Sequence, residues 1–173
     1  GGDVGEGRLA GPERIVDRAI ELLTAGSEPA ALPAGARPLP AASGDAGMGW
    51  RGRRVLVSAG GTREAIDPVR YLGNRSTGKQ GHALAEEAAQ LGAAVTLVTT
   101  SELPTSPAIE RRQVTSAAEM ADAVLEAAPS MDLVIMAAAV ADFTPAAVAD
   151  RKLKKADGAP SIELVPTQDI LAE

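Results

Sequence analysis

Short apolar runs that end in small residues recur along the chain and constrain its fold more than any other feature. RVLVSAGG at 54–61, AAVTLVTT at 93–100 and MDLVIMAAAVAD at 131–142 have the composition of strands in a parallel sheet. The third run is so continuously apolar that we expect it to be buried on both faces. Shorter strands are expected near RRQVT at 111–115 and SIELV at 161–165.

Two helical segments separate these runs. TGKQGHALAEEAAQLG begins with Thr77, a residue type that caps helices, and ends with Gly92, a residue type that stops them. SAAEMADAVLEAA opens with Ser116 and Glu119, which have the spacing of a capping box. Because strands alternate with helices, the sequence predicts a Rossmann-like α/β fold, with an open, mostly parallel sheet and helices on both faces.

The first 50 residues have a different character. Residues 1–23 hold one short amphipathic helix, whose apolar stripe needs a partner that we place upstream of Gly1. Residues 24–50 are dominated by Ala, Gly, Pro and Ser, which is typical of a flexible linker. The predicted organisation is therefore a helix at 1–23, a linker at 24–50 and an α/β domain at 51–173.

Composition excludes several classes of function. The formal net charge of −6 and the 2% of aromatic residues are unfavourable for a nucleic-acid-binding protein. The chain has no cysteine and one histidine, so disulfides, thiolate chemistry and a zinc cluster are not expected. Its longest uncharged apolar run, at 133–141, is far shorter than the roughly 20 residues of a membrane span. We expect a cytoplasmic protein that binds small molecules, with no membrane and no nucleic acid as partner.

A near-match to a phosphate-binding loop lies at YLGNRSTGKQG. From Gly73 the sequence fits G-x-x-x-x-G-K, but Gln80 stands where that loop needs a hydroxyl for Mg²⁺. The loop also begins well after its strand ends near Ala59. The dinucleotide fingerprint G-x-G-x-x-G is absent as well, and no acidic residue closes the second strand in TLVTTS. Both familiar glycine motifs are therefore excluded.

Two segments remain that suit phosphate groups. GGT at 60–62 leaves backbone N–H groups uncovered, and NRSTG at 74–78 offers hydroxyls, an amide and a helix N-terminus. A simpler interpretation is that the glycines make a tight turn and that Ser76 or Thr77 only caps a helix. These residues alone do not separate the two interpretations.

The order of the motifs resembles a known family. AGGTREAIDPVRYLGNRSTGKQG, followed by AAAVADF and KLKK, is similar to phosphopantothenate–cysteine ligase, the second enzymatic half of a bifunctional coenzyme A biosynthesis protein. The resemblance runs from about residue 54 to residue 171. It implies that CTP, with Mg²⁺, activates the carboxylate of 4′-phosphopantothenate as an acyl-cytidylate, which the amine of cysteine attacks. The products are 4′-phosphopantothenoylcysteine, CMP and pyrophosphate.

The resemblance also implies roles for particular residues. Asn74 would hold the acyl-cytidylate, Arg70 would support the same loop and phosphopantothenate, and Lys152 completes the implied catalytic set. No residue is implied as a metal ligand. The implied nucleotide-binding residues are Gly60, Gly61, Thr62, Ser76, Thr77 and Gly78 for the phosphates; Ala139, Ala141, Asp142 and Phe143 for the base and ribose; Lys152, Lys154 and Lys155 in a mobile loop that closes over the triphosphate; and Asp169 and Ile170 of TQDIL.

The start of the chain resembles the other half of the same bifunctional protein. GDVGEGRLAGPERIV is similar to the tail of its decarboxylase, where a cysteine serves a flavin-dependent reaction, but Gly1 stands at that position here. FMN would belong only to that decarboxylase half, so its activity is not carried over. The family continues beyond TQDILAE and works as a dimer, so we expect a fragment of a homodimeric ligase, whose activity in isolation is in question.

Two alternatives stay open at this stage. One is a Rossmann-type NAD(P)-dependent oxidoreductase, and the other is a non-catalytic assembly fragment whose Ala-rich sheet serves as a dimer partner. Protection of the domain against thermal unfolding by CTP but not by NADH would favour the ligase. If no nucleotide protects the domain, the assembly fragment would be favoured.

Overall fold

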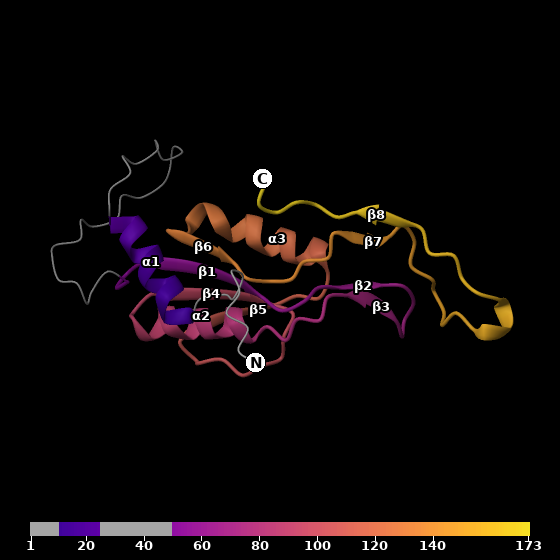
Figure 1. Cartoon of the computed structure of the whole chain (residues 1–173), viewed down its shortest axis with the longest axis horizontal. Coiled ribbons are helices and arrows are strands. Elements are labelled where there is room, and N and C mark those ends of the chain that lie inside the picture. The colour runs from indigo at the N-terminus through magenta and orange to yellow at the C-terminus, as the bar shows by residue number, and fades with distance from the viewer. Residues whose placement is uncertain (1–10, 25–49) are drawn as a thin grey trace, which may run out of the picture.

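A four-stranded parallel sheet forms the centre of the molecule (Figure 1). The computed structural model describes residues 11–24 and 50–173. The strand order is β5 (Ile109–Gln113), β4 (Ala94–Thr99), β1 (Arg54–Ala59) and β6 (Leu133–Met136), and every neighbouring pair is parallel. The four central strands lie where the sequence predicts them, and the α/β fold class is confirmed.

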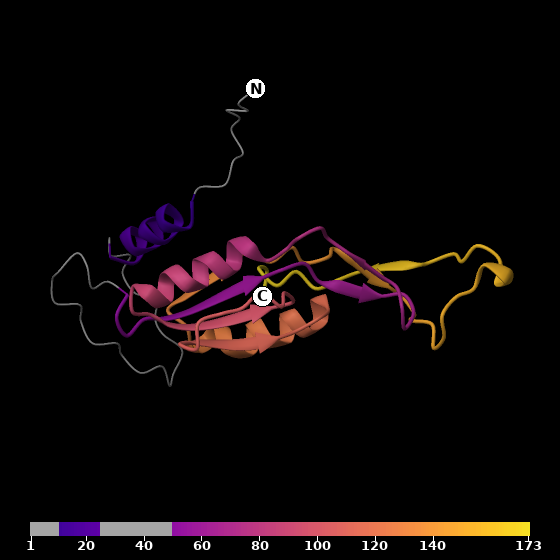
Figure 2. The ribbon, with the colours of Figure 1, turned by 90° about the horizontal axis from the view of Figure 1, so that it is seen from below.

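Helices cover both faces of this sheet (Figure 2). One core cluster joins α2 (Lys79–Gln90) to the sheet, and a second cluster joins α3 (Ala117–Ala127) to the opposite face. A 3₁₀ turn, η1 (Ala128–Ser130), continues α3. The first helix, α1 (Pro12–Thr24), packs on α2 and buries Val16 completely in the first cluster. The apolar stripe of α1 therefore finds a partner within this chain, where we had expected it upstream of Gly1.

The helix ends follow the sequence signals with one exception. Ser116 and Glu119 form the predicted capping box of α3. Gly92, with φ of +97°, follows the end of α2 as predicted. The predicted N-cap of α2 is wrong by one residue, because the cap position is occupied by Gly78 with φ of +77° and no side-chain capping bond. The left-handed backbone at that position favours glycine over threonine.

The prediction that the third apolar run is buried on both faces is also wrong. β6 is an edge strand, and Val134 is 37% exposed. Only one side of β6 pairs with a neighbouring strand in the described part of the chain, so apolar composition alone overstated its burial.

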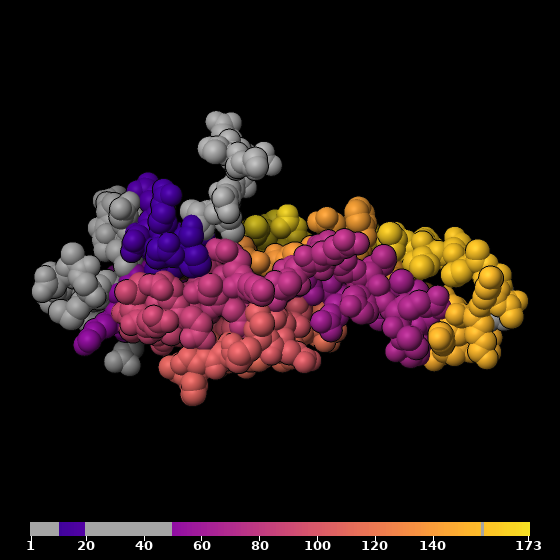
Figure 3. Space-filling view, turned by 60° about the horizontal axis from the view of Figure 1, so that its bottom comes forward, coloured from indigo at the N-terminus to yellow at the C-terminus, as the bar shows by residue number. Residues whose placement is uncertain are grey.

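An arm of two short antiparallel ribbons extends from the sheet (Figures 1 and 3). The first ribbon pairs β2 (Arg63–Ala65) with β3 (Tyr71–Gly73). The second pairs β7 (Phe143–Pro145) with β8 (Leu164–Pro166), and η2 (Lys155–Asp157) lies in the segment between them. The strand expected near SIELV corresponds to β8, whereas β2, β3 and β7 were not predicted. Strands of three residues are too short to show a periodicity.

No helix among residues 11–24 and 50–173 is long and apolar enough to cross a membrane.

Gly81 fixes how closely α2 approaches the sheet. A Cβ atom at Gly81 would lie 2.6 Å from Ala59 Cβ and 2.8 Å from the Ser58 carbonyl oxygen. Both distances are below van der Waals contact, so any larger residue must push α2 away from β1.

We predict that Gly81→Ala destabilises the protein by about 1–3 kcal/mol, the usual cost of overpacking a core. At a solvent-exposed position inside a helix, Gly→Ala would instead stabilise the protein by about 1 kcal/mol. The sign of the measured change therefore shows whether Gly81 is in close contact with β1. Urea unfolding measures it. Gln90→Ala, at the exposed end of the same helix, is the control. A stabilised Gly81→Ala protein would show that α2 is not in close contact with β1.

His82 is buried against the end of β4. It is 5% exposed, its Nε2 lies 3.1 Å from Thr99 Oγ1, and its Nδ1 has no hydrogen-bond partner. Burial lowers the pKa of His82, and the nearby Arg111 guanidinium adds to that effect. His82 is therefore a structural residue.

We predict that the free energy of unfolding falls as the pH drops from about 7.5 to about 5.5. The unfolded chain binds a proton at His82 near the ordinary pKa of about 6.5, and the folded chain does so only at lower pH. His82 is the only histidine in the chain, so His82→Gln should flatten this dependence. Denaturant titrations at several pH values measure both proteins. Equal slopes for the two proteins would contradict the assignment.

Candidate functional site

Three loops meet at the carboxyl edge of the parallel sheet. Residues 60–62 follow β1, residues 100–101 follow β4, and residues 137–141 follow β6. Ligands of open α/β sheets bind outside this edge. The predicted glycine and alanine motifs are therefore brought together, and Thr100 and Ser101 join them although the sequence analysis had not singled them out.

The two glycines of GGT are required by close contacts. Gly60 has φ of +90°, and a Cβ there would lie 2.2 Å from Thr100 Oγ1. A Cβ at Gly61 would lie 2.7 Å from the Asn74 carbonyl oxygen. Thr100 Oγ1 also donates to the Gly61 carbonyl oxygen at 2.9 Å. These glycines thus pack three loops against one another, which is more than a simple turn requires.

Thr62 holds the alanine-rich segment in place. Its hydroxyl oxygen accepts a hydrogen bond from the Ala141 N–H at 2.9 Å, and its own N–H donates to the Ala139 carbonyl at 3.2 Å. The Ala139 N–H donates in turn to the Gly60 carbonyl at 2.7 Å. Thr62 is completely buried, so its observed role is to position residues 139–141.

The NRSTG turn connects to the same segment. Asn74 Nδ2 donates to the carbonyl oxygens of Ala139 and Val140, at 3.3 and 3.2 Å. Ser101 Oγ donates to the Thr77 carbonyl at 3.0 Å, and Gly78 packs directly against Ser101. Ser76 accepts only a long bond from the Gly78 N–H, at 3.4 Å. The turn therefore lies fixed beside the N-terminus of α2, and the Asn74 and Thr77 side chains are exposed.

A cavity of about 390 Å³ lies beside residues 138–142 and is closed on its other side by residues 167–171. Thr167 links the two walls, because its hydroxyl donates to the Ala141 carbonyl at 2.6 Å and its N–H donates to the Asp142 carbonyl at 3.0 Å. The volume is that of a small-molecule pocket. Among the predicted residues, the cavity is lined by Ala139, Ala141, Asp142, Asp169 and Ile170.

Phe143 does not line this cavity. It lies on β7, pairs with Pro166 of β8 and is 52% exposed. The described residues hold no group of three or more His, Cys, Asp or Glu side chains close enough to bind a metal. Asp142 and Asp169 are the acidic residues among those that line the cavity.

The predicted lysine loop lies apart from the glycine turns. Lys152, Lys154 and Lys155 are exposed. Figures 1 and 2 both place this segment at the far end of the arm from the parallel sheet. The sequence grouped these lysines with Ser76 around one triphosphate, and the structure does not bring them together.

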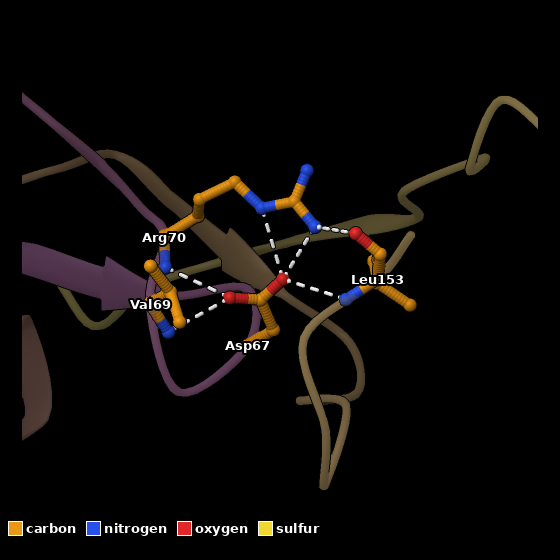
Figure 4. A network of polar contacts seen from close by, with 4 residues as sticks. All are labelled: Asp67, Val69, Arg70 and Leu153. Carbon is orange, nitrogen blue, oxygen red and sulfur yellow. Dashed lines mark hydrogen bonds and ion pairs between the residues drawn. The ribbon is translucent and has the colours of Figure 1, made fainter. Parts of the chain in front are cut away.

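Instead, the lysine loop is bound to the turn between β2 and β3 (Figure 4). Asp67 Oδ1 accepts hydrogen bonds from the N–H groups of Val69 and Arg70, at 2.8 and 2.9 Å, and so closes the turn at Asp67. Asp67 Oδ2 accepts from Arg70 Nε at 2.9 Å, from Arg70 Nη2 at 2.5 Å and from the Leu153 N–H at 3.1 Å. Arg70 Nη2 also donates to the Leu153 carbonyl at 2.7 Å.

These donors, above all the Arg70 guanidinium, hold the pKa of Asp67 well below its usual range. Asp67 is therefore ionised at neutral pH. The sequence analysis did not identify the bond from Leu153 to Asp67, because the two residues are 86 positions apart along the chain.

Comparisons with known proteins identify a family and several relatives of this chain. The family described as DNA/pantothenate metabolism flavoprotein C-terminal domain matches residues 50–173. The Coenzyme A biosynthesis bifunctional protein CoaBC of Mycobacterium bovis is 56% identical over 124 residues, which are 70% of this chain and 30% of that protein. The protein of the same name from Bacillus subtilis is 45% identical over 174 residues, 99% of this chain and 38% of its own length.

A solved structure is similar as well. The crystal structure of the C-terminal domain of Coenzyme A biosynthesis bifunctional protein CoaBC is 43% identical, with a TM-score of 0.60 over 70% of this chain and 57% of that one. The chain thus spans about a third of the length of the two curated relatives. From residue 50 onward, this chain belongs to the family of DNA/pantothenate metabolism flavoprotein C-terminal domains, which forms the C-terminal part of coenzyme A biosynthesis proteins.

Proposed function

We propose that this domain is a CTP-dependent phosphopantothenate–cysteine ligase. CTP activates the carboxylate of 4′-phosphopantothenate as an acyl-cytidylate and releases pyrophosphate, and the cysteine amine then displaces CMP. The observation that carries the proposal is the cavity beside residues 138–142. Ala139, which lines this cavity, donates its N–H to the Gly60 carbonyl and accepts from Asn74 Nδ2, so the cavity wall is bonded directly to both turns.

In this proposal the cavity takes the base and ribose of the nucleotide. The Val140 and Asp142 N–H groups face the ring nitrogen and carbonyl of cytosine, because the N–H groups of Ala139 and Ala141 are already bonded to Gly60 and Thr62. Backbone carbonyls of the segment keep a second lone pair for the cytosine amino group. Asp142, Asp169 and Ile170 complete the cavity walls. Phe143 lies on the neighbouring ribbon and reaches the nucleotide only by moving toward the cavity when the nucleotide binds.

The phosphates lie over the turn that opens α2. The first N–H groups of a helix have no partner inside the helix, and the helix dipole favours anions at that end. Ser76 and Thr77 add hydroxyls, while Gly60, Gly61 and Gly78 are buried and let the neighbouring loops pack closely behind this turn. Mg²⁺ enters with the triphosphate, which supplies most of its ligands, as is usual for this ion.

Catalysis then consists of positioning and charge stabilisation. No side-chain nucleophile is needed, because the substrate carboxylate is itself the nucleophile. Asn74 stands between the phosphate turn and the cavity and holds the acyl-cytidylate. Arg70 with Lys152, Lys154 and Lys155 binds phosphate groups at the arm. Thr62 keeps residues 139–141 in register with the turn.

Further parts of the proposal concern assembly and location. A homodimer is proposed, because apolar side chains are exposed along the arm at Val69, Val148, Leu164 and Val165. Its proposed location is the cytoplasm. The substrates are CTP, phosphopantothenate and cysteine, and neither nucleic acid nor membrane takes part. FMN belongs to the decarboxylase part of the bifunctional relatives and has no role in this domain.

We predict that CTP with Mg²⁺ raises the melting temperature of the full-length protein and that NADH does not. Mass spectrometry of a reaction without cysteine should detect the acyl-cytidylate. Lys152→Gln should slow its formation by about 10-fold to 100-fold, since a charge-assisted hydrogen bond contributes about 1.5–3 kcal/mol. Arg151→Gln removes a charge from the same loop and should have a smaller effect. Protection by NADH instead of CTP would make the domain an oxidoreductase, and no protection by either would favour the assembly role.

We predict that Asn74→Asp lowers ligation by about 10²–10³-fold, as the loss of one preorganised donor does. The new carboxylate would also face the carbonyl oxygens of Ala139 and Val140, which now accept from the amide. Single-turnover kinetics measures the loss. Circular dichroism and CTP binding are the controls, and both should stay near wild type. Equal loss of folding and binding would make Asn74 a structural residue only.

A further inference from the structure

A buried carboxylate joins two parts of the arm that are distant in sequence. The Asp67 side chain is completely inaccessible to solvent, and the Arg70 side chain that it binds is 44% exposed. Asp67 also accepts from the Leu153 N–H, and Arg70 donates to the Leu153 carbonyl. Both backbone polar groups of Leu153 are therefore satisfied by one ion pair on the opposite ribbon (Figure 4).

This contact determines which side chains of the lysine loop face solvent. Leu153 is half-buried and lines an apolar cavity with Ile66 and Ala149. Lys154 has an extended backbone, with φ of −101° and ψ of 150°, and neighbouring side chains of an extended chain point to opposite sides. Lys154 accordingly lies on the side away from Leu153, and both Lys152 and Lys154 are exposed.

The same ion pair orients Arg70. Nε and Nη2 of its guanidinium are engaged by Asp67, and Figure 4 shows the remaining terminal nitrogen, Nη1, directed away from both Asp67 and Leu153. A guanidinium held in this way keeps N–H donors for an external anion and loses little freedom on binding it.

We propose that Asp67 is a positioning residue that holds Arg70, Lys152 and Lys154 together as one phosphate-binding unit at the end of the arm. This inference rests on the proposed function, because the phosphate belongs either to the nucleotide or to 4′-phosphopantothenate. Asn74 lies four positions after Arg70, which is about 13 Å of extended chain. The unit is thus held at a fixed distance from the place where the substrate carboxylate reacts.

Asparagine is the informative substitution at this position. Its carbonyl oxygen can still accept from the Val69 and Arg70 N–H groups, so the turn remains. Its amide nitrogen, however, would face three donors: Arg70 Nε, Arg70 Nη2 and the Leu153 N–H. Asp67→Asn therefore breaks the links to the guanidinium and to the lysine loop and leaves the turn in place.

The first experiment measures the anchoring directly, in the full-length protein and without nucleotide. Hydrogen–deuterium exchange of the peptide that contains Leu153 should be faster in Asp67→Asn, while β1 and β4 keep their protection. Asp150→Asn removes an exposed carboxylate from the same segment and should leave exchange unchanged. Leu153→Pro removes the N–H that donates to Asp67, whereas Leu153→Ala removes only the side chain. Comparing the two variants therefore tests the Leu153–Asp67 hydrogen bond from the Leu153 side.

The second experiment measures the consequence for binding. Asp67→Asn should raise KM for the substrate whose phosphate the unit holds by about 10-fold to 100-fold, the cost of misplacing a binding group by about 1 Å. A higher KM for CTP would show that the unit binds a phosphate of the nucleotide. A higher KM for phosphopantothenate would show that it binds the phosphate of that substrate. The affected KM should also depend less on salt than in wild type, since fewer fixed charges face the anion. A merely structural role would not change that dependence.

The outcomes are distinct. Faster exchange with a higher KM and a flatter salt dependence supports the proposal. Unchanged exchange at Leu153 overturns the anchoring, and faster exchange with both KM values unchanged overturns the phosphate-binding role. If the wild-type protein forms no acyl-cytidylate from CTP, the proposed function is wrong, while the exchange result still decides whether Asp67 anchors the loop.

Discussion

The pairing of β1 with β6 continues past the ends of both strands, and the candidate site depends on that continuation. Gly61 forms a parallel bridge with Ala139, and the Gly60 carbonyl accepts from the Ala139 N–H. These contacts place the glycine turn of one strand against the alanine-rich segment of the other. Asn74 and Thr62 then attach to the same segment, so two loops that are far apart in sequence form one rigid surface beside the cavity.

The sequence predicted the parts of the fold that depend on local patterns. Long apolar runs located the four strands of the sheet, and Ser116 with Glu119 marked the start of α3. The N-cap of α2 was missed because the backbone turns left-handed at Gly78, a requirement set by packing on Ser101 and not by capping preference. Likewise, the exposure of Val134 depends on strand order, which composition does not encode.

For the site, the sequence identified the motifs but not the way in which they connect. It grouped the phosphate turn, the alanine segment and the lysine loop by resemblance, and the structure brings only the first two together. Ser101 carried no motif, and the role of Asp67 depends on a partner 86 residues away. Contacts of that range come from topology, so they become visible only when the strands and ribbons are placed in space.

The position of β6 at the edge of the sheet has a consequence for handling the isolated domain. In the described residues, its outer row of backbone N–H and C=O groups has no strand beside it, and Val134 is exposed nearby. Such an edge is a template for another extended chain, which makes it a site of intermolecular sheet growth. At high protein concentration, solubility of the isolated domain therefore depends on whether this edge is covered, independently of how well the core is packed.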